Sequence, residues 1–238
     1  GACRKVGEGT MCPSYMAMRD EETSTRGRAN ALRLAMSGQL GEEALTSDRM
    51  QEVLELCLAC KACTSECPNS VELAKLKSDF PQMHHDRHGT PLGARLTGAM
   101  PDAAPFAAGP WAPLVNAVQR SAAFRWALEK LVGVDRRRVL PAYAAQPFAR
   151  WFDRRQSSGN ASGERRRVVL FDDTYLSYFE PGIGRAAVAL LEGCGYEVIR
   201  AGAGCCQRPR LSKGLLHEAK RHGHATLTKL DRYARQGL

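Results

Sequence analysis

The stretch Cys57-Leu-Ala-Cys60-Lys-Ala-Cys63-Thr-Ser-Glu-Cys67-Pro68 decides how the rest of the chain is interpreted. Its spacing, C-x2-C-x2-C-x3-C-P, is the one with which thiolates hold cubane iron–sulfur clusters. Three thiolates two residues apart can reach three corners of one cubane, and in two-cluster proteins the fourth binds the neighbouring cluster. A zinc site usually pairs two C-x2-C units across a longer loop. The stretch therefore favours an iron–sulfur cluster over a zinc site or a set of free cysteines.

Length and composition indicate an ordinary globular protein. The 238 residues suffice for one large or two small domains, with 44% hydrophobic and 25% charged residues. No apolar run is long enough for a membrane span, and nothing at the start resembles a signal peptide. Nine cysteines in metal-type spacings suit a reducing cytoplasm better than a disulfide scaffold. Because the sequence starts at Gly1 without a methionine, we expect an internal piece of a longer polypeptide.

The net charge of +9 raises the question of nucleic-acid binding. The arginines are scattered, however, and form triplets only at Arg136–Arg138 and Arg165–Arg167. No zinc finger, RNA-binding sheet signature or basic-region heptad accompanies them. An anionic cluster, an acidic partner or a solvated surface explains the charge more simply. We expect no nucleic-acid partner, and a nucleic-acid-binding protein with a structural cluster is kept as a distant alternative.

A second Cys-Pro pair, Cys12-Pro13, lies near the start of the chain, after Cys3. Because the ligands cross between clusters in two-cluster modules, Cys12 should complete the cluster of Cys57, Cys60 and Cys63. Cys67 should then join Cys3 and ligands that precede Gly1, unless the first binding loop is modified. We therefore expect one complete and one incomplete 4Fe-4S cluster in this sequence. Arg4, Lys5 and Lys61 lie beside these cysteines in sequence, either as tuning charges for the clusters or as ordinary solvated bases.

Helical patterns fill the segment between the two Cys-Pro units. Thr23–Met36 is predicted to be a capped helix, and a second helix from Ser47 or Asp48 runs into the cluster loop. After Pro68, Asn69 and Glu72 form a capping pair, with Leu73, Leu76 and Phe80 on one helix face. This arrangement resembles the α-helical ferredoxins.

The resemblance becomes more specific when the motifs are taken in order. These are Cys12-Pro-Ser-Tyr, Arg19-Asp-Glu-Glu, Ser24-Thr-Arg-Gly-Arg-Ala-Asn-Ala-Leu-Arg and the cysteine run from Cys57. Together they resemble the FAD-linked oxidases that join a flavin dehydrogenase domain to an iron–sulfur domain, of the D-lactate or D-2-hydroxyglutarate dehydrogenase type. The C-terminal half of that family is similar to the iron–sulfur subunits of anaerobic glycerol-3-phosphate dehydrogenase and glycolate oxidase.

Residues 81–156 carry less information and are predicted to be a helical connector. His84, His85 and His88 lack a partnering carboxylate pattern, so a solvated or capping role is expected. Met100–Pro113 is predicted to be a connecting segment, and Leu114–Leu131 a single helix that ends at Gly133. The Gly/Ser-rich stretch Gln156–Gly163 is predicted to be a linker and a domain boundary.

Residues 165–238 alternate strand and helix patterns, which predicts a parallel α/β unit. Two strands are expected, at Arg167–Phe171 and Gly195–Arg200, and the loop after the second contains Cys205-Cys206. This pair resembles the Cys-Cys-Gly motif of the cysteine-rich domain in the same family, which helps hold an unusual iron–sulfur cluster or forms a redox-active site. Gln207 replaces the usual glycine, and Asp172-Asp173 occupy a strand end that can carry a cysteine in related domains. A cluster and a structural or redox-active pair both remain open.

The predicted fold is mostly α: a ferredoxin-type domain at 1–80, a helical connector at 81–156, and the start of an α/β cysteine-rich domain at 165–238. The resemblance implies an iron–sulfur electron-transfer segment of an oxidoreductase that oxidises a D-2-hydroxy acid. FAD would lie in an upstream domain of the same chain, and the acceptor would be a quinone or a protein carrier. An iron–sulfur subunit of an anaerobic glycerol-3-phosphate dehydrogenase or glycolate oxidase is the alternative. No residue here is assigned a catalytic role, and the expected location is the cytoplasm or the inner face of the membrane.

Overall fold

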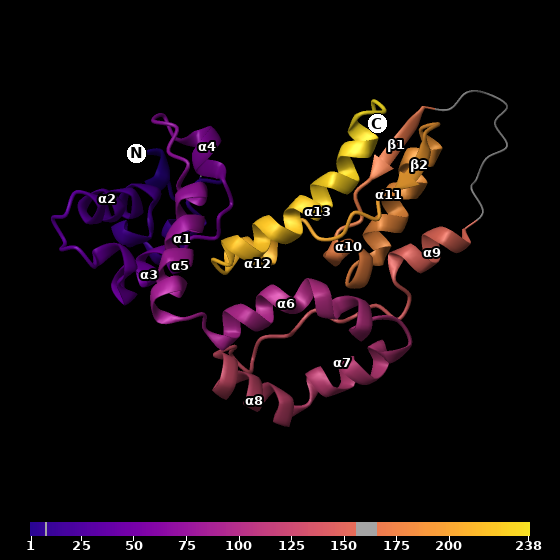
Figure 1. The fold of residues 1–238 in the computed structure, drawn as a ribbon, viewed down its shortest axis with the longest axis horizontal. Helices are drawn as coiled ribbons and strands as arrows, with labels where there is room; N and C mark the ends of the chain where they lie inside the picture. Colours follow the sequence, from indigo (N-terminus) through magenta and orange to yellow (C-terminus); the bar gives the residue numbers. More distant parts are fainter. Residues whose placement is uncertain (8, 156–165) are drawn as a thin grey trace. The chain divides into compact units, whose positions relative to one another are not determined.

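The computed structural model describes residues 1–7, 9–155 and 166–238, which are mostly helical with one two-stranded parallel sheet (Figure 1). The predicted linker Gln156–Gly163 lies outside the described residues. The elements, in chain order, are η1 (Ala2–Arg4), α1 (Pro13–Met18), η2 (Glu21–Thr23), α2 (Thr25–Met36), η3 (Ala44–Thr46), α3 (Asp48–Glu55), α4 (Ala62–Glu66), α5 (Leu73–His88), α6 (Leu92–Ala107), η4 (Gly109–Trp111), α7 (Ala112–Arg120), α8 (Ala122–Val132), α9 (Phe148–Arg154), β1 (Arg167–Leu170), α10 (Thr174–Tyr178), α11 (Pro181–Gly193), β2 (Glu197–Arg200), α12 (Arg208–Ser212) and α13 (Leu216–Ala234).

The chain forms two compact units, and each contains segments that are distant in sequence. The first unit consists of Gly1–Arg95 together with Arg210–Glu218. The second consists of Leu96–Pro209 together with Ala219–Leu238. The division into domains at 1–80, 81–156 and 165–238 stays a prediction. The predicted fold class, mostly helical with a parallel α/β part, is confirmed.

The first unit is built around a core that mixes cysteines with large apolar side chains. Leu32, Leu54 and Leu73 are almost fully buried there, on α2, α3 and α5. Ser24 and Ser47 begin two of these helices, because their hydroxyls accept hydrogen bonds from Gly27 N (3.0 Å) and Met50 N (3.2 Å). The helices predicted at Thr23–Met36 and from Ser47 or Asp48 are therefore confirmed, with starts at Thr25 and Asp48.

The third predicted helix of this unit begins later than expected and extends further. Pro68 and Asn69 form a turn, with Ser70 in the left-handed conformation at φ 49°, so the helix cannot start at Asn69. The Glu72 side chain makes no capping hydrogen bond, and the predicted capping pair is wrong. Leu76 is 40% exposed and does not share the buried face of Leu73. The helix continues through Pro81 as far as His88.

The segment Arg210–Glu218 packs on α5 within the first unit. The Gln82 Oε1 atom accepts hydrogen bonds from Leu216 N (2.7 Å) and His217 N (3.3 Å). These two amides belong to the first turn of α13, where no intrahelical acceptor exists. The Gln82 side chain of α5 therefore caps the N-terminus of α13, which lies more than a hundred residues later in the sequence.

Two of the three histidines of α5, His84 and His85, are not solvated in the way that the sequence predicts. His84 Nε2 lies 2.9 Å from Asp48 Oδ1, and His88 Nε2 lies 3.0 Å from Thr46 O. His85 is buried, with 6% of its surface exposed. The solvated role is therefore wrong for His84 and His85, because both face neighbouring segments of the same unit.

Burial lowers the pKa of His85 below its usual value, and the neighbouring His84 lowers it further. In the unfolded chain the pKa of this histidine is about 6.5. The unfolded chain therefore binds a proton at His85 more readily than the folded first unit does. We expect the stability of the unit to fall as the pH drops below about 6.5. Denaturant unfolding at a series of pH values measures this slope, which His85→Gln should reduce. His217→Gln removes an exposed histidine of the same unit and serves as the control.

The second unit contains the sheet and the helices that cover it. β1 and β2 lie side by side (Figure 1). They pair in parallel, with Val168 opposite Val198. Phe148 of α9 and Val188 of α11 are fully buried against them. The predicted parallel unit is confirmed, because a helical crossover joins two β-rich runs.

Two predictions for the connector are wrong. Most of Met100–Pro113 is helical, since α6 continues through Pro101 and Pro105 to Ala107. The alanines around these prolines have the highest helix propensity, and Ala104 is fully buried, so packing as well as propensity favours the helix. The predicted helix Leu114–Leu131 is two helices, because Ser121 leaves the helical conformation and caps α8 by accepting from Phe124 N at 3.3 Å. The end at Gly133 is confirmed.

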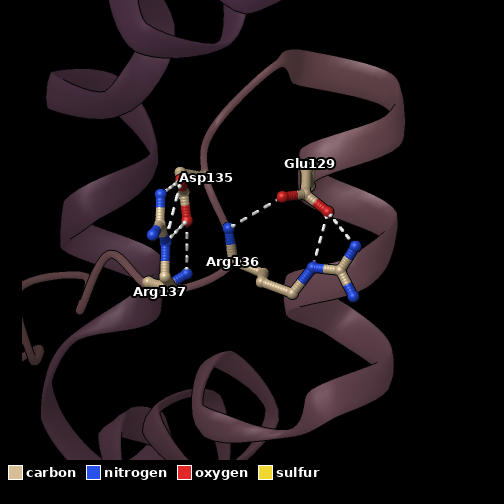
Figure 2. Close-up of polar contacts among 4 residues, drawn as sticks. All are labelled: Glu129, Asp135, Arg136 and Arg137. Carbon is tan, nitrogen blue, oxygen red and sulfur yellow. Dashed lines mark hydrogen bonds and ion pairs between the residues drawn. The ribbon is translucent and has the colours of Figure 1, made fainter.

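Much of the arginine triplet after α8 is paired locally (Figure 2). Arg136 contacts Glu129 at 2.7 Å, and Arg137 contacts Asp135 at 2.6 Å. The hydrogen bonds from Arg137 hold the pKa of Asp135 well below its usual range. The charge of these two arginines is therefore balanced by nearby carboxylates. Among the described helices, none is long and apolar enough to cross a bilayer.

Candidate iron–sulfur centre

Four of the predicted ligands line one cavity of the first unit: Cys12, Cys57, Cys60 and Cys63. Three come from the loop after α3 and the start of α4, and Cys12 lies just before α1. Ala59 and Lys61 have positive φ values of 49° and 65°, and these left-handed residues turn the loop tightly around the cavity. The structure thus brings Cys12 together with a loop that is 45 residues away in sequence.

Cys3 and Cys67 occupy a different position from these four cysteines. Both pack in the same core, Cys3 buried and Cys67 half-buried, but neither lines the cavity. This separation is the one that crossing ligands require. The assignment of each cysteine as a ligand stays a prediction.

Exposure differs among the four cysteines of the cavity. Cys12 and Cys63 are buried, Cys57 is half-buried and Cys60 is exposed. Leu58, in the same loop, is 63% exposed. One side of the cavity is therefore formed by a loop at the protein surface.

The Cys12 sulfur is surrounded by polar groups. Thr25 Oγ1 lies 3.5 Å from Cys12 Sγ, and Arg28 Nη1 lies 3.7 Å from it. The sulfur itself lies 3.5 Å from Thr23 O, which accepts from the thiol. Donors of this kind are the outer contacts that orient thiolate ligands and adjust the potential of a cluster.

Glu66, between Cys63 and Cys67, connects the two cysteine motifs. Its carboxylate accepts hydrogen bonds from Thr10 N at 2.9 Å and Met11 N at 3.1 Å, directly before Cys12. The hydrogen bonds from Thr10, followed by that from Met11, lower the pKa of Glu66. This carboxylate therefore holds the Cys12 segment against the second motif.

Two buried cations flank the cavity, and sequence analysis missed both. Arg28 of α2 is fully buried and lines the cavity. Lys77 of α5 is 8% exposed and donates to Glu55 O at 3.2 Å and to the carbonyl of Cys57. The sequence does not reveal that either side chain is buried, because an Arg or Lys on a helix is usually solvated.

The donor set fits a cubane better than a single ion. Among the described residues, no three Cys, His, Asp or Glu side chains converge as ligands of one metal ion. The thiolates of a cubane bind different irons and stand farther apart. Arg28 Nη2 is buried without a hydrogen-bond partner in the described chain, as a donor beside an anionic group would be.

The predicted second site, Cys205-Cys206, lies in the second unit at the carboxyl ends of the strands. A cavity of 310 Å³ is lined there by Cys205, Asp172, Asp173 and Arg200. Asp172 pairs with Arg200 at 3.0 Å and accepts from Gly202 N at 2.7 Å.

The two thiols of this pair differ in their surroundings. Cys205 Sγ accepts from Gln207 N at 3.3 Å and lines the cavity, whereas Cys206 is exposed and lies 3.8 Å from Asp173 Oδ2. Partial desolvation of the thiol, and after it the charges of Cys205 and Asp173, raise the pKa of Cys206. The raised pKa disfavours the thiolate form of Cys206, and the role of the pair stays open between a cluster and a structural or redox pair.

Residues 1–71 match the family model described as a 4Fe-4S dicluster domain. This part of the chain is accordingly an iron–sulfur domain of the electron-transfer class. Most of the chain is distantly similar to D-2-hydroxyglutarate dehydrogenases: 26% identity over 91% of the chain for the Pseudomonas putida protein, and 26% over 81% for that of Escherichia coli K12. The resemblance to this group is confirmed.

Another relative is a subunit of the anaerobic glycerol-3-phosphate dehydrogenase of Escherichia coli K12, with 26% identity over 47% of the chain. The chain spans 25%, 19% and 28% of these three relatives. No solved structure matches the chain.

Proposed function

We propose that this chain is the iron–sulfur electron-transfer segment of an FAD-linked dehydrogenase that oxidises a D-2-hydroxy acid. The observation that carries the proposal is the arrangement of Cys12, Cys57, Cys60 and Cys63 around one cavity, in a part that matches a dicluster domain. Electrons would come from reduced FAD in a domain outside this sequence and leave to a quinone or a protein carrier. A cubane supplies the one-electron steps that such an exchange needs.

The residues of the chain have separate tasks in this scheme. Cys12, Cys57, Cys60 and Cys63 hold one cluster, and Cys3 and Cys67 contribute to a second. Glu66 fixes the position of Cys12 relative to the loop, and Lys77 fixes the loop backbone at Cys57. The exposed Cys60 places one edge of the cluster near the surface, where electrons can enter or leave.

The extent of similarity favours a D-2-hydroxy acid as the substrate of the parent protein. The two D-2-hydroxyglutarate dehydrogenases match 91% and 81% of the chain, whereas the glycerol-3-phosphate dehydrogenase subunit matches 47%. The alternative, an iron–sulfur subunit of an anaerobic glycerol-3-phosphate dehydrogenase or glycolate oxidase, rests on that shorter match. The thiolates of this chain offer electron transfer, so substrate oxidation is assigned to the flavin domain.

Anaerobic reconstitution with iron and sulfide tests the cluster. We expect the wild-type chain to bind about four irons per cluster and to show a low-temperature EPR signal after reduction. Cys63→Ser should lose both, whereas Cys194→Ser, which changes an exposed cysteine outside the two cavities, should retain them. Uptake of one zinc ion without sulfide, in place of iron, contradicts the proposal.

The full-length parent protein tests the substrate. D-2-Hydroxyglutarate, D-lactate and glycolate are added in turn under anaerobic conditions, and flavin bleaching is followed together with the cluster EPR signal. Bleaching by one of these acids, followed by cluster reduction, supports the proposal. Bleaching by glycerol 3-phosphate alone moves the assignment to the alternative.

A further inference from the structure

Arg28 is a buried cation that lies against the sulfur of a predicted cluster ligand, Cys12. Its exposed surface is 0%, although arginine is rarely buried without a charged partner. The cations expected from sequence, Arg4, Lys5 and Lys61, are all exposed, and Arg4 pairs with Glu21 at 3.4 Å. Of the two buried cations that flank the cavity, Arg28 and Lys77, only Arg28 lines it among the described residues, so Arg28 is the one placed to act on a cluster from inside the protein.

The contacts of Arg28 hold its guanidinium group against Cys12. Arg28 Nε donates to Val53 O at 3.0 Å, and Nη1 donates to Ser14 Oγ at 3.1 Å and to the carbonyl of Thr23. The same Nη1 lies 3.7 Å from Cys12 Sγ. The side chain is therefore fixed in one orientation by acceptors from several segments of the first unit.

These contacts leave one N–H donor of Arg28 without an acceptor and its positive charge without a carboxylate partner among the described residues. Arg28 Nη2 is buried and has no hydrogen-bond partner among the described residues. None of the described carboxylates forms an ion pair with Arg28, and a second cation of this unit on which its charge acts, Lys77, is also buried. Burying two like charges is costly unless an anionic group compensates them. A cubane with four thiolates carries a net negative charge and would lie on the side where Arg28 lines the cavity.

We propose that Arg28 sets the reduction potential of the cluster held by Cys12, Cys57, Cys60 and Cys63. Its fixed charge and its N–H groups stabilise the reduced cluster, which has one more negative charge than the oxidised form, and thereby raise the potential. Because the charge is buried, solvent and salt screen it much less than those of Arg4, Lys5 or Lys61. This inference rests on the proposed function.

Arg28→Met removes the charge and the donors and should lower the midpoint potential in an EPR-monitored redox titration. We expect at least a tenfold change in the one-electron equilibrium constant, which corresponds to ~59 mV. Arg28→Lys keeps the charge without the planar donor group and should recover part of the shift. Arg33→Met removes an exposed arginine from the same helix and should change the potential little.

If Arg28→Met does not fold, a measurement on the wild-type chain tests the contact between Arg28 and the cluster. With ¹⁵N-arginine incorporated, pulsed EPR of the reduced cluster should detect nitrogen coupling that disappears in Arg28→Lys. An unchanged potential in a loaded Arg28→Met variant, or the absence of any ¹⁵N coupling in the wild type, overturns this inference alone. A wild-type chain that takes up no iron and sulfide overturns the proposed function, and this inference with it.

Discussion

Cys12→Ser is expected to destroy the 4Fe-4S cluster of the Cys57–Cys63 loop, although Cys12 lies 45 residues before that loop. The reason is that Cys12 lines the same cavity as Cys57, Cys60 and Cys63, so that its loss leaves one iron without a thiolate. Iron content and low-temperature EPR of the reduced chain measure the effect. We expect most of the 4Fe-4S signal to disappear, and Cys12→Ala, which offers no oxygen ligand in place of the sulfur, should lose it as well.

Cys67→Ser is the matched control, because Cys67 belongs to the same C-x3-C-P motif but does not line the cavity. The signal of this variant should remain close to that of the wild type, and Cys3→Ser should behave in the same way. Should Cys67→Ser abolish the signal while Cys12→Ser keeps it, the ligands do not cross and the two-cluster arrangement is wrong.

Gly214→Ala is expected to detach the segment Arg210–Glu218 from α5 and to destabilise the first unit. A Cβ atom at this position would lie 2.3 Å from Pro81 Cβ, and the backbone has a φ of +69° that L-residues rarely adopt. The left-handed conformation costs about 1–2 kcal/mol, and the steric conflict adds about 1–3 kcal/mol. Hydrogen exchange at the amides of Leu216 and His217, which Gln82 holds, should accelerate strongly.

Gly38→Ala separates the cost of the left-handed backbone conformation from the cost of the steric conflict. Gly38 has a similar φ of +76°, but nothing lies within 4 Å of the position of its Cβ atom. This variant should therefore show the conformational cost alone, about 1–2 kcal/mol, and leave exchange at Leu216 and His217 unchanged. Equal effects of the two substitutions would mean that the contact with Pro81 contributes nothing to stability.

Local signals account for the parts that the sequence predicts well. Ser24 and Ser47 begin helices because a hydroxyl satisfies an amide within three residues, which is a contact that the sequence itself displays. The cysteine spacing likewise predicts the domain class, because the loop must bring three thiolates around one site over a few residues. The parallel pairing of β1 and β2 follows from the strand–helix–strand order.

Where local signals compete, prediction from the sequence fails. The prolines at 101 and 105 indicate a break, yet the alanine-rich stretch continues as α6. Ser121 can continue a helix or cap one, and only the packed structure selects the cap. His85 appears polar in the sequence, but its side chain faces the interior of the first unit.

By itself, the sequence determined the iron–sulfur class, the pairing of Cys12 with the later motif as a prediction, and the mostly helical fold, because each depends on spacing or on neighbours within a turn. Only the tertiary structure decided that Glu66 holds the segment before Cys12, that Arg210–Glu218 packs on α5, and that Arg28 and Lys77 are buried beside the cavity. Whether a basic side chain is solvated or enclosed depends on which helix faces meet, and residues distant in sequence supply those faces. The sequence therefore shows that Arg28 is present, but only the tertiary structure shows that its charge is buried beside the cavity.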